Sequence, residues 1–236
     1  MRPKEFFKKL FEVGAVKIDT RPGYGFKMRI HDTQPDAPLS PIYLNLRTPD
    51  NPKPGPLTLE LVAEIGRILW NVVEESDIAF DGICGIPNAG VPLVKAFDAA
   101  AFSDSNSHSP ILTLRKEVRN NKPAFTGIAD NDGLGATNFK KNRQNHVLLI
   151  DDVITYGGTK DGAVKVFIKQ GYTIKTILVF CDRQQGGTEH LYNKQGIKLE
   201  SAFTLSNIVD MLRSIGCVSP ADCSIVLKYL EETRVQ

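Results

Sequence analysis

The sequence predicts an α/β fold in which a parallel sheet is flanked by helices. Apolar runs of strand length alternate with segments of helix length through the middle of the chain. These runs are apolar throughout, as in strands that are covered on both faces. The chain has 236 residues, 42% hydrophobic and 24% charged, which is typical of a globular protein.

The N-terminal part is predicted to contain one helix, a turn-rich stretch and a short strand. Between residues 5 and 16, four apolar side chains recur at helical spacing: Phe6, Phe7, Leu10 and Phe11. Residues 42–46 have the pattern of a strand. Three prolines in residues 52–56 predict a loop, and an amphipathic helix should follow over residues 57–75.

The alternating part predicts strands at residues 80–85, 111–114, 146–150 and 174–181, with helices at 91–101 and 159–170. Two further helices are predicted at residues 204–215 and 220–232. No internal repeat and no second core are visible in the sequence. We therefore expect a single domain over residues 1–236, with a core at about 57–185 and a small hood formed mainly by residues 1–50 and 186–236.

The segment of residues 117–145 is unusual because it is long and polar, with few periodic apolar positions. Loops of this length in compact domains are usually functional or disordered. We expect a mobile loop at about residues 115–130 that acts as a catalytic lid. The sequence assigns no role to the polar insert at residues 131–145.

The strongest motif covers residues 147–159, where an apolar strand ends at Asp151 and Asp152 and a Gly/Thr loop then opens a helix. Ligands of open α/β sheets bind at the carboxyl ends of strands. Backbone N–H groups at a helix N-terminus suit a phosphate monoester. Ionised carboxylates accept hydrogen bonds from sugar hydroxyls or bind a hydrated cation. The motif therefore indicates a ribose 5-phosphate site, and a helix cap is the simpler alternative.

This motif, IDDVITYGGT, resembles the signature of type I phosphoribosyltransferases, which bind 5-phosphoribosyl 1-pyrophosphate (PRPP). The resemblance implies that Asp151 and Asp152 contact the ribose hydroxyls. The 5-phosphate would lie among Thr155, Tyr156, Gly157, Gly158 and Thr159. Residues 85–92 resemble the loop that holds pyrophosphate in this family, which implicates Pro87, Asn88 and Ala89.

Other segments resemble orotate phosphoribosyltransferases: residues 25–47 the hood, residues 114–117 the start of the catalytic loop, and residues 180–187 a segment whose arginine contacts orotate. An arginine fork suits the carboxylate of orotate, and the resemblance implies this role for Arg183. Arg29, Tyr43, Leu44 and Thr155 complete the expected orotate site. A surface ion pair is the alternative for Arg183, and ordinary packing is the alternative for the two hood side chains.

The implied reaction develops positive charge on the ribose and negative charge on the leaving pyrophosphate. Asp151 and Asp152 would stabilise the first, and Arg115, Lys116 and Mg²⁺ the second. The resemblance adds Arg119 to the loop cations, and it implies a homodimer in which the loop reaches the partner's site. Mg²⁺ should arrive with PRPP and have no protein ligand beyond a water-mediated contact to Asp151 or Asp152.

The sequence departs from the family pattern in four places, one of which is Arg29, where the hood of the family often has a lysine. Arg119 stands where a lysine is common, Asn121 where a histidine is common, and Ala89 where a lysine is common. Asn121 cannot carry a proton at neutral pH, and Lys122 is a partial substitute. The pyrophosphate side is thus expected to have fewer cations of its own.

Two other functions compete with orotate transfer. One is a type I phosphoribosyltransferase for another nucleobase, which should differ from this sequence in the hood and around Arg183. The other is a PRPP-sensing regulator without catalysis, which should carry a basic nucleic-acid face. The balance of 29 basic and 27 acidic residues speaks against such a face and against a nucleic-acid partner.

Composition excludes several remaining classes. No apolar run approaches the roughly 20 residues of a membrane span, and the first residues lack a signal-peptide core. Four cysteines without metal-binding spacing predict free thiols and a cytoplasmic location: Cys84, Cys181, Cys217 and Cys223. Four dispersed histidines give no metal cluster: His31, His108, His146 and His190.

Overall fold

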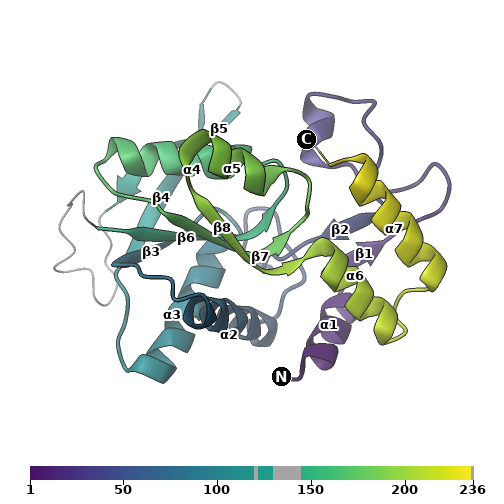
Figure 1. Ribbon diagram of the computed structural model, residues 1–236, viewed down its shortest axis with the longest axis horizontal. Helices are drawn as coiled ribbons and strands as arrows, with labels where there is room; N and C mark the ends of the chain where they lie inside the picture. Colours follow the sequence, from purple (N-terminus) through teal and green to yellow (C-terminus); the bar gives the residue numbers. More distant parts are fainter. Residues whose placement is uncertain (120–121, 130–144, 235–236) are drawn as a thin grey trace.

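A central sheet of six strands organises the computed structural model, which describes residues 1–119, 122–129 and 145–234 (Figure 1). The strand order is β5-β4-β3-β6-β7-β8. Their bounds are Gly82–Gly85 (β3), Ile111–Arg119 (β4), Lys122–Ala129 (β5), Val147–Ile154 (β6), Thr176–Asp182 (β7) and Lys198–Thr204 (β8). Neighbouring strands are parallel except for β4 and β5, which are antiparallel. The predicted parallel sheet is thus confirmed, with one antiparallel edge strand.

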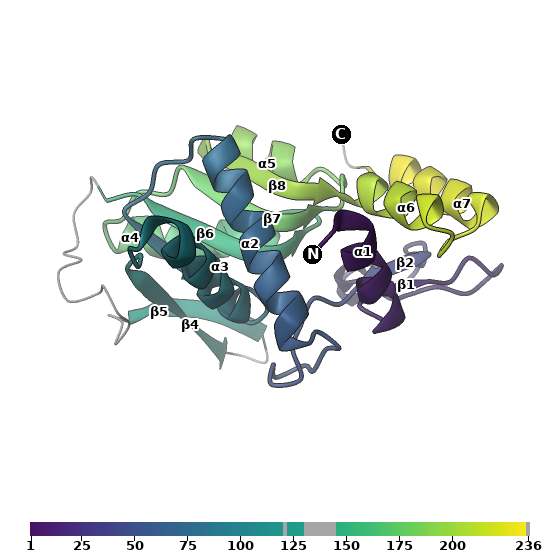
Figure 2. The same cartoon turned by 90° about the horizontal axis from the view of Figure 1, so that it is seen from below.

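Helices cover both faces of this sheet (Figures 1 and 2). Leu148 and Ile150 of β6 join one apolar cluster with α2 (Leu59–Glu75) and α3 (Gly90–Ser105). Their neighbours Val147 and Leu149 point the other way and pack with α4 (Gly158–Lys169) and α5 (Gly187–Gln195). Side chains of a strand alternate between faces, so a strand buried on both must be apolar at every position. This explains the continuous apolar runs in the sequence.

Most of the segments predicted to form the hood lie together at one end of the molecule (Figure 1). They comprise α1 (Pro3–Glu12), β1 (Val16–Ile18), a 3₁₀ turn η1 (Arg29–Asp32), β2 (Ile42–Leu44), α6 (Leu205–Ser214) and α7 (Pro220–Glu232). Residues 187–204 of the predicted hood do not: they form α5 and β8, which belong to the central sheet and the helices that cover it. β1 and β2 form a separate antiparallel pair. Phe6 of α1 and Leu230 of α7 belong to the same apolar cluster as α2 and α3, so the hood shares its core with one face of the sheet.

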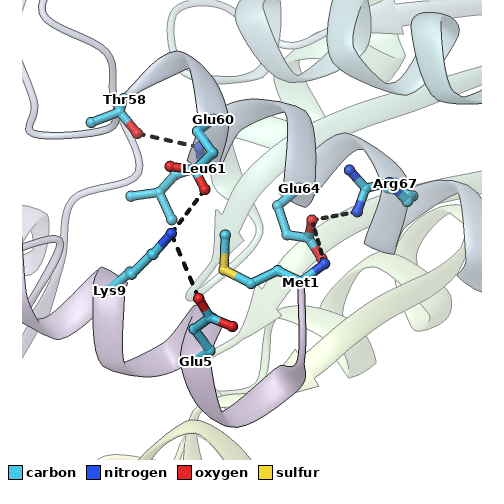
Figure 3. Close-up of polar contacts among 8 residues, drawn as sticks. All are labelled: Met1, Glu5, Lys9, Thr58, Glu60, Leu61, Glu64 and Arg67. Carbon is cyan, nitrogen blue, oxygen red and sulfur yellow. Dashed lines mark hydrogen bonds and ion pairs between the residues drawn. The ribbon is translucent and has the colours of Figure 1, made fainter.

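Polar contacts also fix α1 against α2 (Figure 3). Lys9 Nζ lies 2.8 Å from Glu60 Oε1 and also pairs with Glu5 on its own helix. The amino group of Met1 lies 3.2 Å from Glu64 Oε1, and both groups are largely buried. In the part of the chain that the structure describes, no helix is both long and apolar enough to cross a bilayer.

Several elements were not predicted from the sequence, among them η1 and the hairpin strand β5. β1 has three residues and carries no clear pattern. β8 is an edge strand in which Lys198 and Glu200 form an ion pair, so its polar residues hide the strand. α5 has the polar sequence GTEHLYNKQ and buries Leu191 and Gly187. Short or half-exposed elements have weak hydrophobic periodicity because packing occupies few of their positions.

The segment predicted as a mobile loop, residues 115–130, has regular secondary structure over most of its length. Its motion as a lid stays a prediction. β4 continues to Arg119 and pairs with β5 along most of that segment. Polar cross-strand contacts replace the apolar pattern: Thr126 Oγ1 donates to Glu117 at 3.0 Å, and Lys116 Nζ lies 5.9 Å from the ring centre of Phe125. Asn121 and most of the insert at 131–145 lie outside the described residues, so their predicted roles stay predictions.

Candidate active site

The two carboxylates of the main motif lie inside β6 rather than after its end. The sequence placed the end of this strand at Ile150, but pairing with β7 continues through Val153 and Ile154. Asp151 is 5% exposed. Its Oδ1 accepts a hydrogen bond from the backbone N–H of Asp152 at 2.9 Å. The pair is therefore held by the sheet itself and has little freedom to move.

Lys160 neutralises Asp151, and sequence reasoning missed it. Its Nζ lies 2.6 Å from Asp151 Oδ2, with both side chains buried, and it also donates to the carbonyl of Val153. A buried charge is tolerated when it is paired in this way. The sequence signal that could have identified this residue is a lysine directly after the Gly/Thr loop. The first turn of α4 directs the side chain of that lysine back toward β6.

Asp152 forms no ion pair with any described residue. Its Oδ1 accepts from the backbone N–H of Val153 at 2.8 Å. Burial, followed by the charge of Asp151, raises the pKa of Asp152 to about 7, while Lys160 and Arg47 act in the opposite direction. Asp152 is therefore the carboxylate left for a ligand, whether a hydroxyl donor or a cation.

The predicted phosphate loop, residues 155–159, connects β6 to α4. Gly157 adopts a left-handed conformation with φ 80°, which favours glycine, and α4 begins at the next residue. Thr159 Oγ1 accepts a hydrogen bond of 2.6 Å from Nη1 of Arg29 in η1. Arg29 was expected to contact orotate. The structure instead places its guanidinium at the predicted phosphate loop.

The second predicted loop, between β3 and α3, approaches β6 closely. A Cβ on Gly85 would lie 2.3 Å from the carbonyl oxygen of Gly90, and a Cβ on Gly90 would lie 2.4 Å from that of Ile150. The Pro87–Asn88 peptide is cis. Ala89 is 4% exposed, so it is packed within the loop, and it brings no charge to a ligand. Two contacts reach the loop carbonyls: Lys116 Nζ to Pro87 O at 3.3 Å and Asn51 Nδ2 to Asn88 O at 3.0 Å.

We expect Gly85→Ala to lower the free energy of unfolding by about 1–3 kcal/mol, because the added methyl group overlaps backbone atoms. Gly162→Ala in α4 is the control. Its Cβ would lie 3.4 Å from Phe125, an ordinary contact, and should stabilise the helix by roughly 0.5–1 kcal/mol. Urea unfolding measures both variants. Equal stability of Gly85→Ala and the unchanged protein would contradict this account of the loop.

The cations predicted for the catalytic loop lie on β4, and the side chains of Arg115 and Lys116 point in different directions. A register shift between Arg115 and Lys116 turns the strand locally. Lys116 points toward the site, where burial lowers its pKa; Asp151 opposes this effect, and Arg29, Arg47 and Lys53 add to it. Arg115 is exposed. Arg119 ends β4, and its side chain lies outside the described residues. Sequence reasoning missed Arg47 and Lys53.

Arg183 lies in the interior at 1% exposure, not at the surface as the ion-pair alternative required. Its Nε donates to Gln185 Oε1 at 3.0 Å and its Nη2 to Ser40 Oγ at 3.1 Å. Among the described residues, no carboxylate forms an ion pair with it. Burial lowers its pKa, and the nearby groups of Tyr229 and Tyr156 act in the opposite direction. A buried guanidinium with neutral partners is suited to an anionic ligand.

The remaining predicted base contacts separate. Tyr43 and Leu44 are neighbours on β2 and therefore face opposite sides. Tyr43 stacks on Phe26 with ring centres 5.7 Å apart, whereas Leu44 packs in the apolar cluster at 8% exposure. Leu44 therefore packs in the core, as expected from the alternative of ordinary packing. Tyr156 of the predicted phosphate loop has a raised pKa. Burial is the main cause, Tyr229 of α7 adds to it, and Arg183 acts in the opposite direction.

Comparison with known proteins shows which family the chain resembles. Residues 58–210 match the family model described as "Phosphoribosyl transferase domain". The orotate phosphoribosyltransferase of Saccharolobus solfataricus is 31% identical over 193 residues, which cover 81% of this chain and 85% of that protein. The uridine 5'-monophosphate synthase of Bos taurus is 29% identical over 195 residues, which cover 82% of this chain.

The match to the bovine protein covers 35% of that protein, so the chain spans about a third of its length. Among solved structures, the UMP synthase of Leishmania donovani superposes with a TM-score of 0.70 at 22% identity, covering 98% of this chain and 43% of the other. That likeness shows the fold, and the family model covers more than half of the chain. The chain belongs to the phosphoribosyltransferase family.

Proposed function

We propose that this protein transfers the 5-phosphoribosyl group from PRPP to orotate, giving orotidine 5'-monophosphate and pyrophosphate in pyrimidine nucleotide biosynthesis. The observation that carries the choice of orotate is the buried Arg183, whose described hydrogen-bond partners are both neutral. Orotate is a planar pyrimidine with a carboxylate, and a guanidinium fork matches its geometry and charge. The name of the Saccharolobus solfataricus relative, orotate phosphoribosyltransferase, supports the same substrate.

Different side chains of this protein would contact different parts of the proposed substrates. Asp152, next to the Asp151–Lys160 pair, would accept hydrogen bonds from the ribose hydroxyls and would stabilise positive charge on the sugar. Lys116 contacts the pyrophosphate loop at Pro87 and would stabilise the departing negative charge. Arg183 would orient the base. Together these groups align the reacting nitrogen and carbon, which accounts for a large part of rate enhancement in two-substrate reactions.

Mg²⁺ fits the donor chemistry of this site. Asp152 offers hard oxygen ligands and has no ion-pair partner among the described residues, while Asp151 is satisfied by Lys160. Mg²⁺ prefers oxygen ligands and keeps several waters, so it is commonly held by one or two carboxylates and substrate phosphates. When bound, it would neutralise part of the pyrophosphate charge. A requirement for Mg²⁺ in the assay below is the expected result.

We also propose the homodimer in which the β4–β5 hairpin contributes to the partner's site. The hairpin forms one edge of the sheet, and Arg115 is exposed on it. The hairpin would serve as the lid that excludes water. Residues 1–236 would act as one phosphoribosyltransferase domain, with the hood over the base and the core holding PRPP. All four cysteines are free thiols, which supports a cytoplasmic location.

The test is orotate consumption, followed by its ultraviolet absorbance in the presence of PRPP and Mg²⁺. We expect a loss of absorbance that requires both PRPP and Mg²⁺. If orotate is not consumed while PRPP still raises the melting temperature, the choice of base is wrong and the PRPP site stands. Adenine, hypoxanthine and uracil in the same assay would then identify another acceptor.

A further inference from the structure

A chain of hydrogen bonds connects Arg183 with the end of α7. Gln185 is 1% exposed, and its Oε1 accepts from Arg183 Nε at 3.0 Å. Its Nε2 donates to Thr233 Oγ1 at 2.7 Å. Thr233 follows directly after α7 and is 48 residues away from Gln185 in sequence. The guanidinium that we assign to the base is thus attached to the last helix of the hood.

The hydroxyl of Thr233 determines which end of the Gln185 amide faces Arg183. A hydroxyl has a single proton to donate, and Thr233 uses it on the carbonyl of Tyr229 at 2.7 Å. Its oxygen can then only accept, so Gln185 must turn its NH₂ group toward Thr233. The amide oxygen is left for the Nε–H of Arg183. A reversed amide would place two donors against each other at Arg183 and would set its oxygen against the lone pairs of Thr233.

A second hydroxyl, that of Ser40, fixes the other contact of the guanidinium. Ser40 is fully buried, and its Oγ donates to the carbonyl of Ile42 at 2.7 Å, so it accepts from Arg183 Nη2 at 3.1 Å. The bonds to Gln185 and Ser40 use two of the five N–H donors of the guanidinium. In the part of the chain that the structure describes, Nη1 has no hydrogen-bond acceptor. A carboxylate accepts two parallel bonds from a guanidinium, and the network leaves donors for one.

We propose that Thr233 is a positioning residue for orotate, because it fixes the Gln185 amide that holds the Arg183 guanidinium in one orientation. Thr233 acts through Gln185 and does not itself contact the substrate. The guanidinium keeps its charge for the ligand because both of its partners are neutral. Its orientation is set before the ligand binds, which lowers the cost of ordering the site. This inference rests on the orotate site of the proposed function and deepens it.

Thr233→Val removes the hydroxyl and keeps a branched side chain of similar size. The Gln185 amide then has no acceptor to fix its direction, and we expect the KM for orotate to rise by about 3- to 10-fold, as for the loss of one buried hydrogen bond. The KM for PRPP should stay within about 2-fold. Thr233→Ser keeps the hydroxyl and should return the KM for orotate to within about 2-fold of the unchanged protein. The control is Ser224→Ala in α7, which removes an exposed hydroxyl that also donates to a carbonyl four residues earlier and should change neither KM.

A double-mutant cycle tests whether Thr233 acts through Gln185. Gln185→Met removes the amide and keeps a long unbranched side chain. In that background Thr233→Val should raise the KM for orotate no further, since the group that it directs is gone. Additive rises in the KM would mean that α7 affects the base by another route, and they would overturn the proposal.

The Nε–H of Arg183 gives a readout that does not depend on turnover. A buried, hydrogen-bonded N–H exchanges slowly with water, and NMR can follow this one, identified by its loss in Arg183→Lys. Thr233→Val should speed the exchange by about 3- to 10-fold, whereas Thr233→Ser and Ser224→Ala should leave it unchanged.

Three results would overturn the proposal: equal exchange rates in Thr233→Val and the unchanged protein, an unchanged KM for orotate, or equal rises in both KM values. If the unchanged protein does not consume orotate, the choice of base is wrong. The exchange rate would then still decide whether Thr233 holds Arg183, so the two proposals can fail separately.

Discussion

Asp152→Asn is expected to make the protein more stable at pH 8 while it reduces phosphoribosyl transfer by about 10²–10³-fold. Burial beside Asp151 raises the pKa of Asp152 to about 7, so the ionised form is costly in the folded protein. Asparagine removes this cost. The gain should be at least about 1 kcal/mol, or about 2–4 °C in Tm for a chain of this length.

The pH dependence of this gain has a defined sign. Between about pH 4 and pH 7 the folded state binds a proton at Asp152 that the unfolded state has released, so the stability contributed by this residue falls as pH rises through that window. The advantage of Asp152→Asn should therefore be small near pH 4 and full above pH 7. Thermal melts from pH 4 to pH 8 measure it.

Asp36→Asn is the matched control for Asp152→Asn, because it makes the same charge change at an exposed position of the hood. It should leave both Tm and turnover nearly unchanged. If Asp152→Asn destabilises the protein at pH 8, the assignment of Asp152 as the unneutralised carboxylate is wrong. If it keeps full turnover, the catalytic role is wrong.

Gln185→Glu should raise the KM for orotate by about 10- to 100-fold and leave the KM for PRPP within about 2-fold. The substitution places a carboxylate 3.0 Å from Nε of Arg183, where a neutral amide oxygen now accepts. The guanidinium would then be neutralised by the protein and would bind the orotate carboxylate more weakly. A charge-assisted hydrogen bond contributes about 1.5–3 kcal/mol, which corresponds to this range of affinity.

The control for Gln185→Glu is the same change at the adjacent glutamine. The side chain of Gln184 accepts from the backbone N–H of Ser206 at 3.2 Å, and in the described part of the chain it forms no hydrogen bond with the Arg183 guanidinium. Gln184→Glu should leave the KM for orotate unchanged. Initial-rate kinetics with each substrate varied in turn separate the two constants. Equal KM values for orotate in both variants would remove Arg183 from the base site.

Sequence patterns predicted the core better than they predicted the site. The fully buried strands were identifiable because both faces are apolar, and α7 was predicted at residues 220–232, where the structure has it. Ser219 caps this helix and Pro220 opens it, and both are strong local signals. The β4–β5 hairpin was missed because its pairing depends on polar contacts between strands.

The contacts that were missed at the site are long-range. Arg29 meets Thr159 and Arg183 meets Ser40 across separations of 130 and 143 residues, and no local pattern encodes such pairs. Lys160 was closer to Asp151 in sequence, nine residues away, but its direction depends on where β6 ends and α4 begins. Motifs identified which residue types gather at the site, whereas the partner of each charge required the fold.

The last helix has a consequence for the order in which the protein becomes competent during synthesis. Thr233, at the end of α7, accepts from Gln185, which in turn holds Arg183, and Leu230 shares an apolar cluster with Phe6. Contacts between residues so far apart form late, because the intervening chain must first be made and closed. A nascent chain could thus assemble its sheet on the ribosome while Arg183 still lacks its support. The base site would be completed after α7 is released.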